Sequence, residues 1–371
     1  VRAASLSALF MPLVVSLGAI STALALCVGG NLVFAGSMGL GTLAAFITYT
    51  TQLYDPIQQL ANILAEMQSA QASAERVLDL LDTEPDVKDS PAVEEKYGDL
   101  FTPKPENWPA IEGKVEFDHV SFRYKTGQEV LHDFCLTVQP GQTIALVGET
   151  GAGKSTIVNL VCRFYEPTSG SVKIDGVDYR TRSQLWLQSR LGYVLQTPHL
   201  FSGTVADNLR FARPDATDEE IRRAARTVKA EEFILTLPGG YDAQVGEGGG
   251  RLSTGQKQLL SLARVLLADP RIFVLDEATS SIDTETEATI QEAIQTVLAG
   301  RTSFIVAHRL STIRAADCIL VIRDGRIAES GTHDQLMQQR GLYHSLYTHQ
   351  YRAEATRAAL AHGEGAEKIG R

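Results

Sequence analysis

Charged residues are missing from the start of the chain. Between Ala3 and Tyr54 there is no Asp, Glu, Lys, Arg or His, although 21% of all 371 residues are Asp, Glu, Lys or Arg. Helices of soluble proteins normally carry a charged face, and one crossing of a bilayer needs about 20 apolar residues. We therefore expect two membrane spans, at about 6–35 and 40–63, with a turn in the glycine-rich sequence 36–41. The alternative is a helical hairpin buried in a soluble protein.

Cysteine is also scarce, and its spacing excludes two kinds of site. The cysteines lie too far apart for a C-x-x-C pair and do not suit a disulfide framework, so reduced thiols facing a cytosol are expected. They are Cys27, Cys135, Cys162 and Cys318. The eight histidines do not have the spacing of metal ligands either. A formal net charge of −10 argues against a nucleic-acid partner, because non-specific binding to phosphates needs a basic face.

The pattern of the sequence changes twice after the uncharged stretch. Apolar residues at helical spacing continue from Gln58 to Leu81, and Pro56 is expected to kink this helix. The stretch Thr83–Lys114 contains five prolines among charged residues, which is typical of an irregular linker. Strand-like and helix-like runs then alternate. We expect membrane helices over 1–82, a linker over 83–114, an α/β domain over 115–351 and a tail over 352–371.

One glycine-rich run carries most of the functional information. Residues 148–156 fit GxxxxGK followed by Ser or Thr, between the apolar run 144–147 and an apolar helix start. Glycines let backbone N–H groups approach a triphosphate, and the helix points its positive end at it. Lys154 would reach the β- and γ-phosphates, and Ser155 would ligate Mg²⁺. The alternative is a turn with an incidental lysine. The predicted phosphate-binding residues are Gly148, Glu149, Thr150, Gly151, Ala152, Gly153, Lys154, Ser155 and Thr156.

An acidic pair follows another apolar run. Asp276 comes directly after 272–275, so it is expected at the carboxyl end of a buried strand, where α/β proteins place ligand-binding residues. A carboxylate there can hold Mg²⁺ directly or through water. Glu277 beside it can orient an attacking water and accept its proton. The alternative for an isolated Asp-Glu pair is a solvated turn.

Together with these features, further motifs resemble the ATP-binding cassette (ABC) exporter family. Leu252-Ser253-Thr254-Gly255-Gln256 is similar to the signature LSGGQ. The remaining matches are Tyr124, Leu195-Gln196, Ser280-Ser281-Ile282-Asp283 and Ala307-His308-Arg309-Leu310-Ser311-Thr312. The resemblance covers nearly the whole chain. The fold class it implies is an α-helical transmembrane segment followed by an α/β P-loop NTPase domain of ABC type.

The resemblance also implies roles for single residues. Tyr124 would stack on the adenine of ATP, Gln196 would sense Mg²⁺, and His308 would contact the γ-phosphate. Ser253, Gly255 and Gln256, at the start of an apolar helix, would close on ATP held by a second chain. ATP and Mg²⁺ are therefore the expected ligands, and a second exporter subunit is the expected partner.

Family members of this type fuse six spans to one ATPase domain. Because this chain shows two spans and begins with Val1, we expect a fragment that lacks the first four spans. The expected location is a cell membrane, the plasma or inner membrane, crossed several times by the chain. The nucleotide-binding domain is expected in the cytoplasm, and the transported substrate would be a small molecule or a lipid.

The signature departs from the family pattern at one position. Thr254 replaces a glycine, and its branched side chain stiffens a place where close approach to phosphate is needed. Some family members are heterodimers in which an altered signature from one chain pairs with an altered catalytic glutamate from the other. This chain has Glu277 and an altered signature, which suits the subunit supplying the competent phosphate loop. A homodimer with a tolerated variant is the alternative.

Three functions fit these features. The first is ATP-driven export, in which ATP binding closes paired domains and hydrolysis reopens them. The second is a membrane-anchored ATP-binding regulator or sensor with incidental hydrolysis. The third is a soluble cassette ATPase, which the uncharged amino-terminal stretch argues against.

Overall fold

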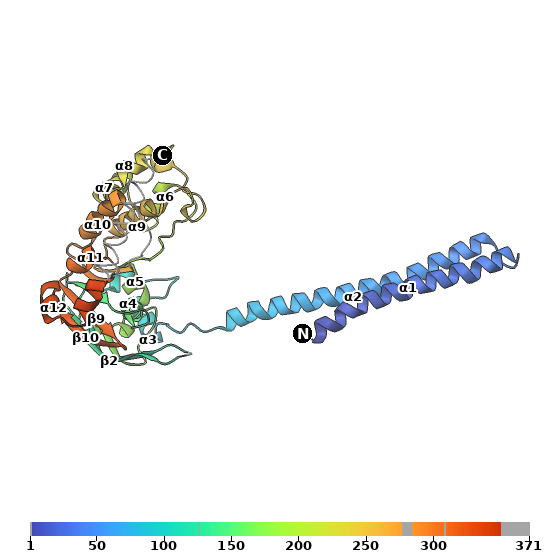
Figure 1. Cartoon of the computed structure of the whole chain (residues 1–371), viewed down its shortest axis with the longest axis horizontal. Helices are drawn as coiled ribbons and strands as arrows, with labels where there is room; N and C mark the ends of the chain where they lie inside the picture. Colours follow the sequence, from blue (N-terminus) through green and yellow to red (C-terminus); the bar gives the residue numbers. More distant parts are fainter. Residues whose placement is uncertain (1, 126, 277–283, 308, 350–371) are drawn as a thin grey trace. The chain divides into compact units, whose positions relative to one another are not determined.

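Two long helices form the amino-terminal unit of the structure, Val1–Pro85. They are α1 (Arg2–Phe34) and α2 (Leu40–Asp82), joined by a short turn in which Gly36 has a φ of 73° (Figure 1). The second unit is Asp86–Arg371. The structure is a computed structural model that describes residues 2–125, 127–276, 284–307 and 309–349.

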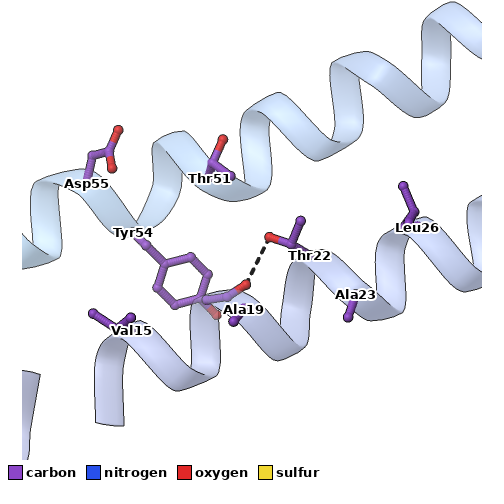
Figure 2. A pocket seen from close by; sticks show the side chains of 9 residues that line it. Val15, Ala19, Thr22, Ala23, Leu26, Thr51, Tyr54 and Asp55 are labelled. Carbon is purple, nitrogen blue, oxygen red and sulfur yellow. Dashed lines mark hydrogen bonds between the residues drawn. The ribbon is translucent and has the colours of Figure 1, made fainter. Parts of the chain in front are cut away.

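Small and hydroxyl-bearing residues bring α1 and α2 together. A Cβ atom on Gly29 would lie 2.3 Å from Cδ1 of Leu43, so glycine permits this close approach. The hydroxyl groups of Ser21 and Tyr54 form a hydrogen bond of 2.9 Å. Figure 2 shows the ring of Tyr54 beside α1, in a hollow of about 580 Å³ between the two helices. Its lining is largely apolar and offers no phosphate-binding groups; it consists of Val15, Gly18, Ala19, Thr22, Ala23, Leu26, Thr51, Tyr54 and Asp55.

Only part of the prediction of two membrane spans is confirmed. Among the described residues, one helical stretch is long and apolar enough to cross a membrane, Pro12–Phe34 in α1. The predicted second span, 40–63, is helical, and its helix continues through Pro56 to Asp82. It does not meet the same criterion of composition, because Thr, Tyr and Gln side chains and the charge of Asp55 dilute its apolar residues.

A six-stranded sheet forms the centre of the second unit. Four of its strands run parallel to β3, and only the edge strand β10 is antiparallel, paired with β9. The alternating strand-like and helix-like runs of the sequence thus form a largely parallel sheet. In order across the sheet the strands are β10 (Arg326–Gly331), β9 (Cys318–Arg323), β3 (Thr143–Val147), β8 (Thr302–Val306), β7 (Ile272–Asp276) and β6 (Leu191–Val194).

The two faces of this sheet belong to separate hydrophobic cores. Every residue of β3 and β8 is buried, as expected for parallel strands that are covered on both sides. Side chains alternate between the faces. Ile144 and Leu146 of β3 enter one core, whereas Ala145 and Val147 enter the other.

The first core is closed by a second sheet and by the helix after the glycine run. This helix, α4 (Lys154–Val161), buries Ile157 and Leu160 among residues of both sheets. The helix α5 (Gln184–Ser189) adds Trp186 to the same core. The second sheet is antiparallel, and its strands in order are β2 (Glu129–Val138), β1 (Val115–Arg123), β4 (Ser169–Ile174) and β5 (Val177–Asp178).

Helices close the second core on the opposite face. Several of them begin with a capping box, in which the side chains of the first and fourth residues satisfy each other's backbone N–H groups. The helices are α6 (Val205–Arg210), α7 (Asp218–Thr227), α8 (Glu231–Thr236), α9 (Thr254–Ala268), α10 (Thr284–Leu298), α11 (Leu310–Arg314) and α12 (His333–Gln339). Short 3-10 turns are η2 (Tyr179–Thr181), η3 (Gly240–Asp242) and η4 (Glu247–Gly249).

The predicted irregular linker 83–114 is more ordered than its prolines suggested. It contains the helix α3 (Pro91–Tyr97) and the 3-10 turn η1 (Pro105–Asn107). Each begins with proline, because the first helical position needs no N–H donor. Val93 and Tyr97 of α3 are buried. This segment, which we call the connector, belongs from Asp86 onward to the second unit.

The two tryptophans of the chain allow a test of how the connector is held. Trp186 is fully buried, and its Nε1 donates a hydrogen bond of 2.8 Å to the carbonyl oxygen of Pro109. The buried Nε1 of Trp108 has no hydrogen-bond partner among the described residues. Trp186→Phe should lower the free energy of unfolding by about 1–3 kcal/mol, because the carbonyl of Pro109 loses its hydrogen bond and a cavity forms in the core.

Urea unfolding followed by circular dichroism would measure this loss, with Trp108→Phe as the matched control. The control makes the same replacement of indole by phenyl without breaking a hydrogen bond, so it should lower the free energy of unfolding by less. Equal losses in the two variants would show that the bond to Pro109 contributes nothing.

Candidate nucleotide-binding site

The glycine run forms a loop between a buried strand and a helix, as predicted. β3 ends at Val147 and α4 begins at Lys154. The φ angles of Gly148, Gly151 and Gly153 are 153°, 86° and 107°, which side-chain-bearing residues rarely adopt. A Cβ atom on Gly148 would lie only 2.3 Å from the carbonyl oxygen of Ile322 in β9. Glycine is therefore required there both by the backbone conformation and by the lack of space.

Lys154 is folded into this loop. Its side chain is 8% exposed, and Nζ donates hydrogen bonds of 2.7 and 2.8 Å to the carbonyl oxygens of Gly148 and Glu149. Burial lowers the pKa of Lys154, and the nearby carboxylate of Asp276 opposes that shift. The loop thus holds a partly desolvated cation that a phosphate group could neutralise.

Residues predicted from separate motifs meet around one cavity of about 460 Å³ beside the loop. They come from the residue after β1, from β2, the loop and α4, from the segment after β6, and from the ends of β7 and β8. The lining consists of Tyr124, Val130, Thr150, Gly151, Gly153, Lys154, Ser155, Thr156, Gln196, Asp276 and Val306. The remaining predicted loop residues, Gly148, Glu149 and Ala152, line a second hollow of about 440 Å³ on the side of β9 and its turn.

Tyr124 lines the cavity and belongs to an aromatic cluster. Tyr124 is half-buried, and its hydroxyl group lies 3.1 Å from Oγ1 of Thr156. Phe122 and Tyr165 contact its ring edge-on, with centroid distances of 4.8 and 5.1 Å. These contacts fix the ring at the cavity. Tyr165 was not predicted, because it belongs to no motif and joins the cluster only through the fold.

Three oxygen donors for a divalent cation face the same cavity. They are the hydroxyl of Ser155, the amide of Gln196 and the carboxylate of Asp276. This donor set suits Mg²⁺, which prefers oxygen ligands. Tyr193 lies on β6, and burial, followed by the charge of Asp276, raises its pKa to about 12. No sequence motif had indicated Tyr193.

Two of the predicted catalytic positions lie outside the described residues. These are Glu277 and His308, and the motif Ser280–Asp283 lies outside them as well. The strands that lead to them are described: Asp276 of β7 pairs in register with Val306 of β8. β8 is also the parallel neighbour of β3. The ends of β7 and β8 therefore lie at the same edge of the sheet as the phosphate loop.

The signature forms the capped start of α9. Oγ of Ser253 accepts a hydrogen bond of 3.2 Å from the N–H of Gln256, and Oε1 of Gln256 accepts one of 3.0 Å from the N–H of Ser253. Gly255 is buried, while Ser253 and Thr254 are exposed. Among the described residues that line the two hollows beside the loop, none belongs to the signature.

Arg264 connects this helix to the segment that follows Gln196. Its guanidinium donates hydrogen bonds of 2.7 Å to the carbonyl oxygen of Asn208 and of 2.9 Å to that of His199. Burial lowers the pKa of Arg264 to about 10. Sequence analysis missed this residue, because a single arginine in an apolar helix carries no recognisable spacing.

A glycine loop between a buried parallel strand and a helix, with an acidic residue at a nearby strand end, defines a P-loop nucleotide-binding domain. Residues 131–280 match the family described as ABC transporter. The chain therefore carries an ABC transporter domain after its amino-terminal helices, which confirms the resemblance and the predicted fold class.

Similar proteins include an ABC transporter protein and a flippase. The chain is 47% identical over 341 residues to the fatty acid ABC transporter ATP-binding/permease protein of Mycobacterium tuberculosis, covering 92% of this chain and 52% of that protein. It is 40% identical over 353 residues to the ATP-dependent lipid A-core flippase of Syntrophus aciditrophicus, covering 95% and 57%. The chain thus spans about half the length of the curated relatives it matches.

A solved structure is similar over the same extent. The structure of a bacterial Atm1-family ABC exporter with ATP bound matches with a TM-score of 0.65 and 35% sequence identity. The match covers 95% of this chain and 58% of that one.

The close approach of Gly148 to β9 predicts a large effect of one methyl group. Gly148→Ala should lower the free energy of unfolding by about 1–3 kcal/mol more than Gly151→Ala, because only the first forces overlap with a backbone oxygen. Gly151 is the matched control, since it also has a positive φ but nothing lies within 4 Å of its Cβ position. Thermal unfolding measures both, and equal losses would contradict the packing argument.

The burial of Lys154 predicts opposite effects on stability and on nucleotide binding. A lowered pKa means that the folded chain binds this proton more weakly than the unfolded chain, so the charge costs stability below the folded pKa. Lys154→Met should therefore leave the melting temperature without nucleotide unchanged or raised. It should also remove the stabilisation by MgATP, which is about 2.7 kcal/mol at a concentration of 100 times Kd.

Scanning fluorimetry with and without MgATP would test this, with Lys229→Met as the control. Lys229 is exposed and lies outside the site, so that variant should keep the shift caused by nucleotide. A normal MgATP shift in Lys154→Met would overturn the assignment.

Proposed function

We propose that this chain is a subunit of an ATP-driven exporter that binds and hydrolyses MgATP at the phosphate loop. The observation that carries the proposal is the single cavity that brings Lys154, Ser155, Gln196 and Asp276 together from three separate parts of the chain. They were predicted from three different motifs, since Lys154 and Ser155 both belong to the phosphate loop. Their convergence on one cavity of about 460 Å³ supports MgATP as the ligand.

The residues divide the work of phosphoryl transfer among them. Backbone N–H groups of the loop and Nζ of Lys154 would hold the β- and γ-phosphates. Ser155, Gln196 and Asp276 would hold Mg²⁺, which neutralises charge on the transferred phosphoryl group. Tyr124 would stack on the adenine ring. From its position after β7, Glu277 would orient the attacking water and accept its proton, and His308 would contact the γ-phosphate.

A second subunit completes the proposed site. The start of α9, with Ser253, Gly255 and Gln256, would close on ATP held by the partner chain, and the partner's signature would close on this one. A helix start is suited to this task, because its free N–H groups attract phosphate. The partner is a copy of this chain or a related subunit, and in a heterodimer this chain would supply the competent loop.

The proposed location is a cell membrane, the plasma or inner membrane, with the nucleotide-binding domain in the cytoplasm. The apolar stretch Pro12–Phe34 supports membrane insertion. The substrate would be a small molecule or a lipid moved by alternating access as the paired domains close and reopen. The names of two relatives, a fatty acid transporter and a lipid A-core flippase, favour a lipid.

Replacing the proposed general base tests the enzymatic part of this proposal. Glu277→Gln should leave the Kd for MgATP nearly unchanged and reduce phosphate release about 100-fold or more, because positioned proton transfer contributes that much to catalysis. The control is Glu292→Gln, which alters an exposed glutamate on α10 and should keep normal turnover. Undiminished ATP hydrolysis by Glu277→Gln would show that Glu277 is not the general base.

Transport is tested separately in lipid vesicles that contain the chain and its partner subunit. An exporter should move a labelled fatty acid only when ATP is hydrolysed, and its ATPase rate should rise with substrate. Hydrolysis that proceeds without any movement or stimulation would favour a membrane-anchored regulator instead.

A further inference from the structure

A buried arginine stands at the end of the phosphate-loop helix, where glycine would be expected. The N–H of Arg163 donates to the carbonyl oxygen of Leu160, and that of Phe164 donates to Asn159, at 3.1 and 2.9 Å. These two bonds form a Schellman motif, which usually places glycine in the left-handed position. Arg163 takes that position with a φ of 54° and is only 1% exposed. Its side chain must compensate for an unfavourable backbone and for the burial of a charge.

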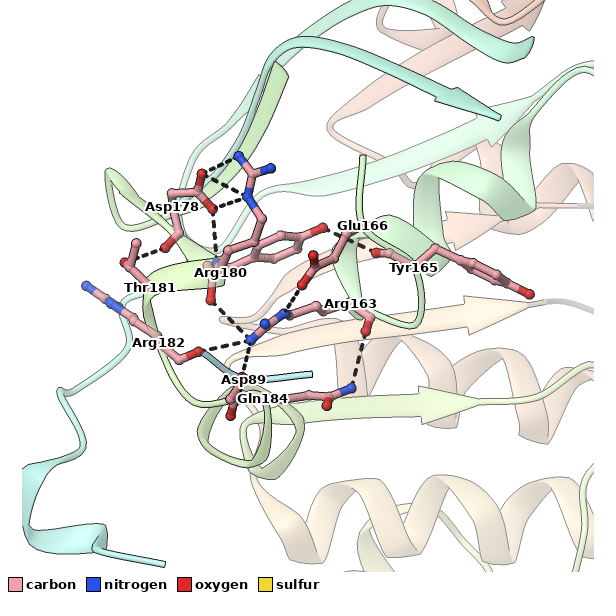
Figure 3. Close-up of polar contacts among 10 residues, drawn as sticks. Asp89, Arg163, Tyr165, Glu166, Asp178, Arg180, Thr181, Arg182 and Gln184 are labelled. Carbon is pink, nitrogen blue, oxygen red and sulfur yellow. Dashed lines mark hydrogen bonds and ion pairs between the residues drawn. The ribbon is translucent and has the colours of Figure 1, made fainter. Parts of the chain in front are cut away.

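The guanidinium of Arg163 binds three segments of the chain, as Figure 3 shows. Nη1 donates hydrogen bonds of 2.8 Å to Oδ1 of Asp89 and 2.9 Å to the carbonyl oxygen of Arg182. Nε donates one of 2.9 Å to Oε1 of Glu166. Nη1 also donates a longer hydrogen bond of 3.4 Å to the carbonyl oxygen of Tyr179, so two carboxylates and two carbonyls surround a cation that water barely reaches.

Asp89 is the partner that arrives from the connector. Its side chain is 13% exposed, and Oδ2 also accepts a hydrogen bond of 2.9 Å from the N–H of Gln184, the first residue of α5. In the sequence, Asp89 follows the end of α2 at Asp82 by a few residues. We call the contact between Asp89 and Arg163 the connector clasp.

The clasp acts on both sides of the nucleotide cavity. The helix α4 begins with Lys154 and Ser155 and ends just before Arg163, and a helix of 8 residues is a rigid rod about 12 Å long. Holding one end therefore fixes the other, which carries the phosphate-binding groups. On the other side α5 leads directly into β6, whose continuation carries Gln196 into the cavity.

We propose that Asp89 and Arg163 are positioning residues of the nucleotide site and that the connector clasp couples the connector to nucleotide occupancy. This inference rests on the proposed function, because it requires ATP at the phosphate loop. ATP bound at one end of α4 holds the helix in position, and the positioned helix strengthens the clasp at its other end. Linkage requires the reverse effect to be equal, so a closed clasp strengthens ATP binding by the same factor.

The first arm of the test measures ATP affinity in the full chain. Asp89→Asn keeps the size of the side chain and removes the charge that pairs with Arg163. It should raise the Kd for MgATP about 5-fold or more, the usual lower range for coupled sites. Asp118→Asn is the matched control, since Asp118 forms an ion pair of 2.8 Å with Lys173 but lies 49% exposed on β1. Its Kd should equal that of the unmodified chain.

The second arm measures hydrogen exchange. Its first measurement uses the unmodified chain, so that measurement does not depend on the folding of a variant. Amides of the connector between 84 and 97 should exchange more slowly when MgATP is added. In Asp89→Asn, at saturating MgATP, this protection should be lost. A role in stability alone would lower the melting temperature but leave both the Kd and the nucleotide-dependent protection in place.

The outcomes separate the two proposals. If the unmodified chain binds ATP and Asp89→Asn and Asp118→Asn have equal Kd values, the clasp is overturned and the proposed function stands. The same holds if MgATP does not change the hydrogen exchange of the connector. An unmodified chain that does not bind MgATP would overturn the proposed function, and the clasp would fall with it.

Discussion

The packing of the phosphate loop against β9 is the constraint on which the site depends. Gly148 lies so close to the backbone of Ile322 that no side chain fits, and the N–H of Gly325 in the β9–β10 turn donates to the carbonyl of Ala152 at 3.3 Å. The loop therefore packs directly against β9 and the turn that follows it. That support holds its backbone conformation, and the cation of Lys154 is enclosed as a result.

The order of the strands then determines which groups share the cavity. β3 lies between β9, which braces the loop, and β8, whose neighbour β7 ends in Asp276. Because β3, β7 and β8 are parallel, their carboxyl ends meet at one edge. Alternating side chains divide the interior into two cores, so α4 is held by the antiparallel sheet on one face while α9 packs on the other.

Polar contacts attach the connector to the end of α4 within the second unit. Arg163 accepts an unfavourable backbone conformation to place a guanidinium among Asp89 and Glu166. On α1, apolar side chains such as Leu24 and Val28 are more than half exposed. Such a surface needs a bilayer or further helices to cover it, which agrees with a subunit of a larger membrane assembly.

Local patterns in the sequence determined the phosphate loop, the strand before Asp276, the capped start of α9 and the long apolar helix, because each is set by residues close together in the chain. They misjudged the connector, where prolines begin helical turns instead of preventing them. The predicted second span, 40–63, is part of a helix that is less apolar than Pro12–Phe34. Only the tertiary structure brought Tyr124, Gln196 and Asp276 to one cavity, revealed Tyr165, Tyr193 and Arg264, and paired Asp89 with Arg163. Those contacts join residues far apart in the sequence, and strand order and burial, which no local spacing encodes, decide them.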